Sequence, residues 1–205
     1  RNRDAMAAAA EQGVNIVVAT GRPLAALPPD VFEIEAIRYA LTSNGASITD
    51  IRENTTFYEN CLSPAAVHAA ADLLQQYDYV LETFVKGVAY IEGWYYRQVE
   101  ETRTCFRDVK YILETRNPVD DIYAFMWEND KHLENINVNF ENLDEKPGMY
   151  EKLIRLPETT ITSSFDHNLE IGGATTSKAD ALRQMSDVDR DVLSVAFKHY
   201  APGDG

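Results

Sequence analysis

Residues 14–23, VNIVVATGRP, pass directly from branched apolar side chains to a threonine, a glycine and an arginine. An apolar run without alternation predicts a strand of a parallel sheet that helices cover on both faces. Ligands of such sheets bind beyond the carboxyl ends of the strands, which is where Thr20, Gly21 and Arg22 stand. A hydroxyl and the amides around a glycine can hydrogen-bond phosphate oxygens, and a guanidinium adds positive charge. The segment is therefore a candidate phosphate site, with a plain turn and an exposed arginine as the alternative.

The segments on either side alternate between helix and strand patterns. Residues 2–12 predict a helix, because AMAAAA has high helix propensity and Gly13 suits a left-handed C-terminal residue. Residues 37–46 form a second apolar stretch that ends in small polar residues and a glycine, and residues 191–197 predict a further buried strand. This order is typical of an α/β fold.

The middle of the chain predicts a separate α+β unit inserted into the first domain. A helix is expected over 63–76, with Ser63 as its N-cap. The acidic and amide-rich run 128–146 is interpreted as a solvated face with loops. Strands are expected over residues 47–51, 79–84, 88–96, 119–130, 159–166 and 168–173.

Lys178 is a second candidate for anion binding. It follows the glycine-containing segment EIGGATTS and opens a predicted helix that Ser177 caps. The N-terminus of a helix favours an anion, so an ammonium group there would share in binding it. A solvated surface lysine is the alternative.

The formal net charge of −14 and the pI near 4.6 argue against nucleic acid as a partner, because most of the surface would repel phosphodiester backbones. A local positive pocket could still bind a small anion. The sequence shows neither a signal peptide nor an apolar run of about 20 residues, so we expect a cytoplasmic protein without a membrane partner. The oligomeric state is not readable.

Metal-ligand and disulfide patterns are absent from the sequence. Cys61 and Cys105 stand far apart outside any CxxC motif, and we interpret them as buried, inert thiols. The four histidines, at positions 68, 132, 167 and 199, have no metal-ligand spacing. The aromatic run at 94–96 would contact a sugar or ring, or belong to the core.

Four strings, ATGRP, TSNGA, NLEI and SKADAL, occur in this order with a long inserted unit between the second and the third. Together they resemble the haloacid dehalogenase-like (HAD) phosphatase superfamily, in its Cof-type branch with a large α/β cap. The resemblance spans nearly the whole chain. It implies a Rossmann-like parallel-sheet core, residues 1–46 and 167–205, with an inserted α/β cap domain, residues 47–166.

The resemblance also implies roles for individual residues. Thr20 would hydrogen-bond the transferring phosphoryl group, and Lys178 would balance its charge. Asn44, from the TSNGA string, would lie near the mouth of the site beside Arg22. Asp204, in the C-terminal PGDG, is the candidate metal ligand. A competing alignment moves KHYAPGDG to a later helix and turn and removes that role.

The sequence departs from the family's catalytic string. The family's nucleophile is the first aspartate of D-x-D-G-T, and its second aspartate is the general acid and base. The 205 residues contain no such string, since Asp187 and Asp189 precede a predicted strand instead of ending one and lack the Gly-Thr. A sheet without its central first strand would expose unpaired edges. We therefore expect an incomplete version of a longer chain that lacks an N-terminal strand, some loop segments and the C-terminal end.

The function that the resemblance implies is Mg²⁺-dependent hydrolysis of small phosphorylated metabolites, with sugar phosphates as one option, through an aspartyl-phosphate intermediate. The cap would close over the leaving group and select the substrate. One alternative is a non-catalytic protein of the same fold that binds a phosphorylated metabolite as a sensor. Another is an unrelated α/β interaction module, which would leave the ordered strings unexplained.

Overall fold

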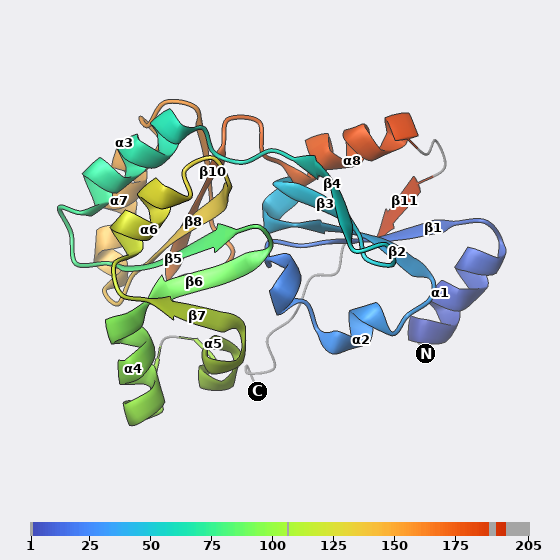
Figure 1. Ribbon diagram of the computed structural model, residues 1–205, viewed down its shortest axis with the longest axis horizontal. Helices are drawn as coiled ribbons and strands as arrows, with labels where there is room; N and C mark the ends of the chain where they lie inside the picture. The colour runs from blue at the N-terminus through green and yellow to red at the C-terminus, as the bar shows by residue number, and fades with distance from the viewer. Residues whose placement is uncertain (1, 106, 189–191, 196–205) are drawn as a thin grey trace.

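A computed structural model describes residues 2–105, 107–188 and 192–195 and contains two mixed β-sheets (Figure 1). The strand order is β11-β1-β2-β3-β4 in the five-stranded sheet and β7-β6-β5-β8-β10-β9 in the six-stranded sheet. Figure 1 shows the six-stranded sheet at one end of the molecule with α3, α4, α6 and α7, and the five-stranded sheet at the other end with α1, α2 and α8. The fold is therefore α/β, as predicted.

In the five-stranded sheet, β1 (Asn15–Ala19) lies between two parallel neighbours, β11 (Val192–Val195) and β2 (Ile37–Thr42). β3 (Ser47–Asp50) and β4 (Thr55–Glu59) continue the sheet in antiparallel pairing. The helical elements of this part are α1 (Asn2–Glu11), η1 (Leu24–Ala26), α2 (Pro29–Phe32), η2 (Ser43–Gly45) and α8 (Lys178–Val188).

The apolar run around β1 is buried on both faces, as predicted. Val17 and Ala19 pack with Ala181 and Met185 of α8. On the opposite face, Ile16 packs in a cluster that includes Met6 of α1, Leu27 and Ile37. The strand therefore lies between two helical layers and ends at Ala19, directly before Thr20.

The six-stranded sheet is antiparallel except for one pair, β6 (Val88–Glu92) with β7 (Arg116–Val119). Its other strands are β5 (Val80–Val85), β8 (Leu133–Asn139), β9 (Thr159–Thr162) and β10 (Asn168–Gly173). Its helical elements are α3 (Pro64–Leu74), α4 (Gly93–Thr102), α5 (Val109–Thr115), α6 (Ile122–Glu128), η3 (Leu143–Glu145) and α7 (Lys146–Leu153).

The two faces of this sheet differ in polarity. Leu81 stands opposite Val138 in the β5–β8 pair, and both belong to the apolar cluster that includes residues of α3, α6 and α7. The next pair along, Glu82 and Asn137, lies on the other face, and Asn137 in turn stands opposite Glu170. This polar face is nevertheless buried, which makes it a candidate surface for chemistry.

Two predictions about the middle of the chain are wrong. Residues 119–130 were expected as a strand, but α6 occupies 122–128, with the Asp121 carboxylate accepting hydrogen bonds from the amides of Tyr123 and Ala124. The run 128–146 was interpreted as a solvated face with loops, but it contains β8, a fully buried interior strand. Its alternation of asparagine with Ile136 and Val138 was the signal for a strand.

Other predictions about local structure are confirmed in full or in part. The Ser63 hydroxyl accepts a hydrogen bond from the Ala66 amide and begins α3, and the Ser177 hydroxyl caps α8 through the Asp180 amide. The strand expected over 88–96 ends at residue 92, where α4 begins.

Sheet membership does not follow the predicted domain boundaries. Residues 47–50 and 55–59, placed in the predicted cap, form β3 and β4 of the five-stranded sheet. Residues 168–173, placed in the predicted core, form β10 of the six-stranded sheet. The division into a Rossmann-like core and a cap domain stays a prediction. No helix in the described ranges is both long and apolar enough to cross a bilayer.

Candidate functional site

The loops that follow β1 and β2 are hydrogen-bonded to each other. The Thr20 amide donates to the Leu41 carbonyl at 3.0 Å, and the Asn44 amide donates to the Thr20 carbonyl at 3.0 Å. The Ser43 amide donates to the Arg22 carbonyl at 2.9 Å. These backbone bonds fix the Thr20–Arg22 segment against the turn η2.

The same turn packs directly on the start of α8. Gly45 has φ +96°, and a Cβ there would lie 2.4 Å from the Ser177 carbonyl oxygen. Only a residue without a side chain allows this approach. At Gly21 the restriction is milder, because a Cβ there would lie 2.9 Å from Oδ1 of Asn44, the end of a side chain. The two glycines thus bring Thr20, Asn44 and Lys178 to one place.

These elements form one wall of a cavity of about 810 Å³ between the two sheets. All five candidates for catalysis and substrate binding line it: Thr20, Gly21, Arg22, Asn44 and Lys178. The opposite wall comes from the six-stranded sheet and its connections and includes Phe84, Arg107, Tyr111, Arg116, Asn137 and Glu170. The lining is established by the structure, while the catalytic and binding roles of the five candidates stay predictions.

Thr20 and Lys178 both have donor groups free for a ligand. The Thr20 hydroxyl oxygen accepts a hydrogen bond from the Arg22 amide at 3.2 Å, which leaves its own O–H proton to donate. Lys178 is the first residue of α8, and its side-chain ammonium makes neither a hydrogen bond nor an ion pair with any residue in the described ranges. An anion in the cavity would satisfy both groups.

The charge around the cavity opposes that of the chain as a whole. The chain has 33 acidic against 19 basic residues, yet among the residues that the structure describes four basic side chains and one carboxylate line the cavity. The basic ones are Arg22, Arg107, Arg116 and Lys178, and the carboxylate is Glu170. A positive cavity in an acidic protein favours a small anionic ligand.

Beneath the far wall lies a buried ion pair that the sequence did not reveal. Nε and Nη2 of Arg116 donate to Oε2 of Glu82 at 3.1 and 2.8 Å, and Nη1 of Arg107 lies 3.6 Å from the same oxygen. Burial would raise the pKa of Glu82, but the charges of Arg116 and Arg107 outweigh it and lower the pKa. Glu82 is therefore a carboxylate that holds two guanidinium groups.

Glu170 joins the two walls. Its Oε2 accepts a hydrogen bond from Nδ2 of Asn44 at 2.5 Å, across the cavity from β10 to the η2 turn. Its Oε1 accepts from the Ser164 hydroxyl at 2.6 Å and from Nδ2 of Asn168 at 3.0 Å. Asn44, predicted near the mouth of the site, thus makes a direct contact between the sheets.

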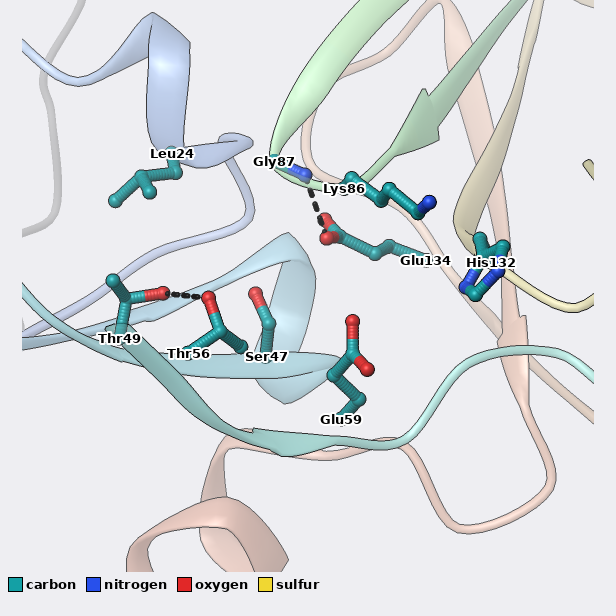
Figure 2. A pocket seen from close by; sticks show the side chains of 9 residues that line it. All are labelled: Leu24, Ser47, Thr49, Thr56, Glu59, Lys86, Gly87, His132 and Glu134. Carbon is teal, nitrogen blue, oxygen red and sulfur yellow. Dashed lines mark hydrogen bonds between the residues drawn. The ribbon is translucent and has the colours of Figure 1, made fainter. Parts of the chain in front are cut away.

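A smaller cavity of about 220 Å³ lies between the sheets next to Glu134 (Figure 2). Figure 2 shows the Gly87 amide pointing at Oε1 of Glu134, a hydrogen bond of 2.7 Å. The Ser43 hydroxyl donates to Oε2, so Glu134 bridges β8 and the η2 turn. Burial raises the pKa of Glu134, and the charge of Glu59 adds to this, although the two hydrogen bonds act in the opposite direction.

The aromatic run at 94–96 does not line the large cavity. Tyr95 is a core residue that packs with Ile91 and Val99. Trp94 is exposed, and the Tyr96 hydroxyl donates to the Leu113 carbonyl. Packing, one of the two roles considered for this run, is what Tyr95 and Tyr96 have in the structure.

The described residues include no group of three or more histidine, cysteine or acidic side chains that could hold a metal ion. Glu170, the carboxylate in the cavity, is already bound by amide and hydroxyl donors. Asp204, the predicted metal ligand, lies outside the described residues, as do His199 and Asp189, while Asp187 falls in the last turn of α8. The donor set of the described residues thus does not fit Mg²⁺.

Comparisons with known proteins identify relatives over most of the chain. A family model described as haloacid dehalogenase-like hydrolase matches residues 1–191. A search of curated proteins finds no match.

Solved structures have the same fold. A haloacid dehalogenase-like hydrolase from B. subtilis superposes with a TM-score of 0.74 at 20% identity, covering 95% of this chain and 74% of its own. One from Bacteroides thetaiotaomicron gives 0.72 at 18% identity, over 94% and 72%. The HAD subclass IIB sugar phosphatase BT4131 gives 0.69 at 14% identity, over 93% and 70%.

Proposed function

The chain belongs to the haloacid dehalogenase-like hydrolase family, and on that premise we propose that it is a phosphatase that hydrolyses phosphate monoesters of small metabolites. The observation that carries the proposal is that Thr20 and Lys178 line one cavity at the carboxyl end of β1. That position is where parallel sheets bind their ligands. The cavity's volume suits a metabolite of sugar size.

We assign Thr20 to the phosphoryl group. Its hydroxyl oxygen already accepts a hydrogen bond from the Arg22 amide, so its O–H proton is available to donate to a separate acceptor. A phosphoryl oxygen is such an acceptor, and the hydrogen bond becomes stronger as negative charge develops on that oxygen.

We assign Lys178 to the same group, as a positive charge that offsets the phosphoryl oxygens. Transfer of a phosphoryl group depends mainly on positioning and on electrostatic stabilisation. The N-terminus of the 11-residue helix α8 adds a favourable dipole at this point. Ser177 holds that terminus in place by capping it.

Arg22, Gly21 and Asn44 complete the substrate-binding side of the proposal. Arg22 lies over the Tyr111 ring, 4.8 Å from its centroid, which restrains the guanidinium beside the cavity. Gly21 permits the close approach of Asn44. Asn44 links the phosphate end to Glu170 on the opposite wall.

The aspartate nucleophile and Mg²⁺ enter the proposal from the family alone. The 205 residues contain no D-x-D-G-T string, and the described residues offer no fitting metal site. In such enzymes Mg²⁺ offsets the carboxylates so that an anionic substrate can approach. Sugar phosphates remain one option for the substrate, since one structure of the same fold is a sugar phosphatase.

The experiment is phosphate release from p-nitrophenyl phosphate by the full-length protein, with Mg²⁺ and with a chelator. We expect turnover that the chelator abolishes. A folded full-length protein that binds inorganic phosphate but shows no turnover would replace the phosphatase with the phosphometabolite sensor. A protein that neither binds phosphate nor releases it would refute both.

A further inference from the structure

The cavity as a whole contains more positive charge than its carboxylates balance. Among the described residues, four basic side chains line it, whereas only Glu82 and Glu170 are carboxylates at its walls, and Arg107 and Arg116 share Glu82 as their one ion-pair partner. Both arginines line the cavity, opposite the Thr20 and Lys178 end. A surplus cation in a mostly buried position requires an anion or water.

Of the two arginines, Arg107 is the one whose side-chain nitrogens all lack a hydrogen-bond partner among the described residues. Arg116 uses its Nε and Nη2 on Glu82 and its Nη1 on the Thr115 hydroxyl. The Arg107 side chain makes no hydrogen bond to any residue the structure describes, and its nearest carboxylate oxygen is 3.6 Å away. Its side chain is only 15% exposed. A guanidinium with free N–H groups in a cavity matches a carboxylate or phosphate.

Two contacts hold the Arg107 guanidinium at this place. It lies over the Phe165 ring, 4.1 Å from the centroid, and Glu82 attracts it from below. The Tyr111 ring contacts an arginine from each wall, Arg22 at 4.8 Å and Arg116 at 4.6 Å from its centroid. The positive groups thus form two sets by origin, Arg22 and Lys178 beside the five-stranded sheet, and Arg107 and Arg116 beside the six-stranded sheet.

Glu170 lies between the two sets, because hydrogen bonds link it to Asn44 on one side and, through Asn168 and Asn137, to Glu82 on the other. Its carboxylate would repel an anionic group in the middle of the cavity but can accept hydrogen bonds from hydroxyls. The polar neighbours Asn137, Thr162 and Ser164 line the same part of the cavity. A ligand that fits the whole cavity is therefore anionic at both ends and hydroxylated between them.

We propose that Arg107, supported by Arg116 and Glu82, forms a second anion-binding subsite, and that the substrate is a hydroxylated phosphate monoester with a second anionic group, a carboxylate or another phosphate, on its leaving group. This inference rests on the proposed phosphatase function. Arg107 is the specificity-determining residue, and Glu82 is a positioning residue that acts through it.

The test uses the full-length protein and three probes with the same hydroxylated six-carbon skeleton. Glucose 6-phosphate has one anionic group, 6-phosphogluconate adds a carboxylate, and glucose 1,6-bisphosphate adds a phosphate. We expect kcat/KM for at least one doubly anionic probe to exceed that for glucose 6-phosphate by about 10-fold or more. The preferred probe identifies the second group.

The variant Arg107→Gln should remove this preference. We expect its kcat/KM for the preferred probe to fall by about 10- to 100-fold, the effect of losing a charged hydrogen bond. Its loss on the preferred probe should exceed its loss on glucose 6-phosphate and p-nitrophenyl phosphate by about 10-fold, because only the doubly anionic probe uses the guanidinium. Arg155→Gln, at an exposed arginine outside the cavity lining, is the matched control and should keep the preference.

A binding measurement tests the second anion-binding subsite separately from the phosphatase function. The thermal unfolding midpoints of the wild type and of both variants are measured at increasing concentrations of each of the three probes. Tighter binding of a doubly anionic probe, lost only in Arg107→Gln, supports the subsite even if no probe is hydrolysed and the phosphatase proposal fails. Turnover of p-nitrophenyl phosphate with no preference among the sugar phosphates, or an equal loss for all probes in Arg107→Gln, would overturn the subsite and leave the phosphatase proposal intact.

Discussion

Thr20 and Lys178 lie 158 positions apart in the sequence and line the same wall of one cavity. The η2 turn brings them together, since its backbone is bonded to the loop after β1 and packs against the first turn of α8. A charged and a hydroxyl donor thus converge where a parallel sheet binds ligands. The proposed chemistry depends on this convergence.

Gly45→Ala should disturb the convergence directly. The new Cβ would meet the Ser177 carbonyl oxygen at 2.4 Å, and alanine is strained at φ +96°. We expect the free energy of unfolding to fall by about 1–2 kcal/mol or more and phosphate release to fall by about 10-fold. Urea unfolding and steady-state kinetics measure the two effects.

Gly148→Ala is the matched control for this change. A Cβ at Gly148 has open space around it, and the residue lies within helix α7. Alanine should raise the free energy of unfolding there by about 0.5–1 kcal/mol and leave kinetics unchanged. Equal behaviour of the two variants would contradict the packing argument.

Glu82→Gln should destabilise the protein strongly, because it leaves the buried Arg116 guanidinium without a counter-charge. Breaking such a pair costs about 3–5 kcal/mol. The pKa of Glu82 is lowered in the fold, so its stabilising effect is present above the ordinary value of 4.5 and is lost as the pH falls below it. The difference in unfolding free energy between wild type and variant should therefore shrink in acid.

The exposed pair Lys110–Glu114 provides the comparison, since its two groups are 3.8 Å apart in solvent. Glu114→Gln should change the unfolding free energy very little. If Glu82→Gln were as mild as Glu114→Gln at neutral pH, the buried pair would not have the role assigned to it.

Glu134→Gln should stabilise the protein at high pH. The raised pKa of Glu134 means that its contribution to stability is complete below the ordinary value of 4.5 and is lost as the pH rises through the value in the fold. Glutamine keeps an acceptor for the Gly87 amide and a partner for the Ser43 hydroxyl without the buried charge.

Thermal unfolding midpoints at several pH values measure this effect. The midpoint of Glu134→Gln should exceed that of wild type increasingly from pH 4.5 to pH 8, by about 2–4 °C for each kcal/mol. Glu59→Gln removes only the neighbouring charge and should give a smaller gain. A midpoint difference that does not depend on pH would show that Glu134 titrates normally.

Local sequence patterns predicted the parts of the fold that depend on residues adjacent in the sequence. The buried run before Thr20 and the serine caps at 63 and 177 are set by propensity and capping, which short segments encode. The strand at 133–139 was missed because asparagines usually face solvent, whereas Asn137 and Asn139 are buried and donate hydrogen bonds to Glu82 and to the Val80 carbonyl of the neighbouring strand β5, partners that only the sheet pairing supplies.

The helix α6 and the arginines at 107 and 116 also depend on contacts between distant segments, which local sequence patterns do not predict. The aromatic residues of 122–128 favour a strand by propensity, yet Ile122 and Met126, one helical turn apart, are both buried against the sheet. Glu82 and Arg116 become partners only because β6 lies between β5 and β7 in the sheet. No spacing along the chain predicts such a pair.

The most direct measurement for the central claim is kcat for phosphate release from p-nitrophenyl phosphate by the full-length protein and its Thr20→Val and Lys178→Met variants. Thr20→Ser, which keeps the hydroxyl, and Lys131→Met, at an exposed lysine, are the controls. We predict that kcat falls by about 100- to 1,000-fold in the first two variants, with unchanged thermal unfolding, and stays near wild type in the controls. Wild-type kcat in both Thr20→Val and Lys178→Met would contradict the account.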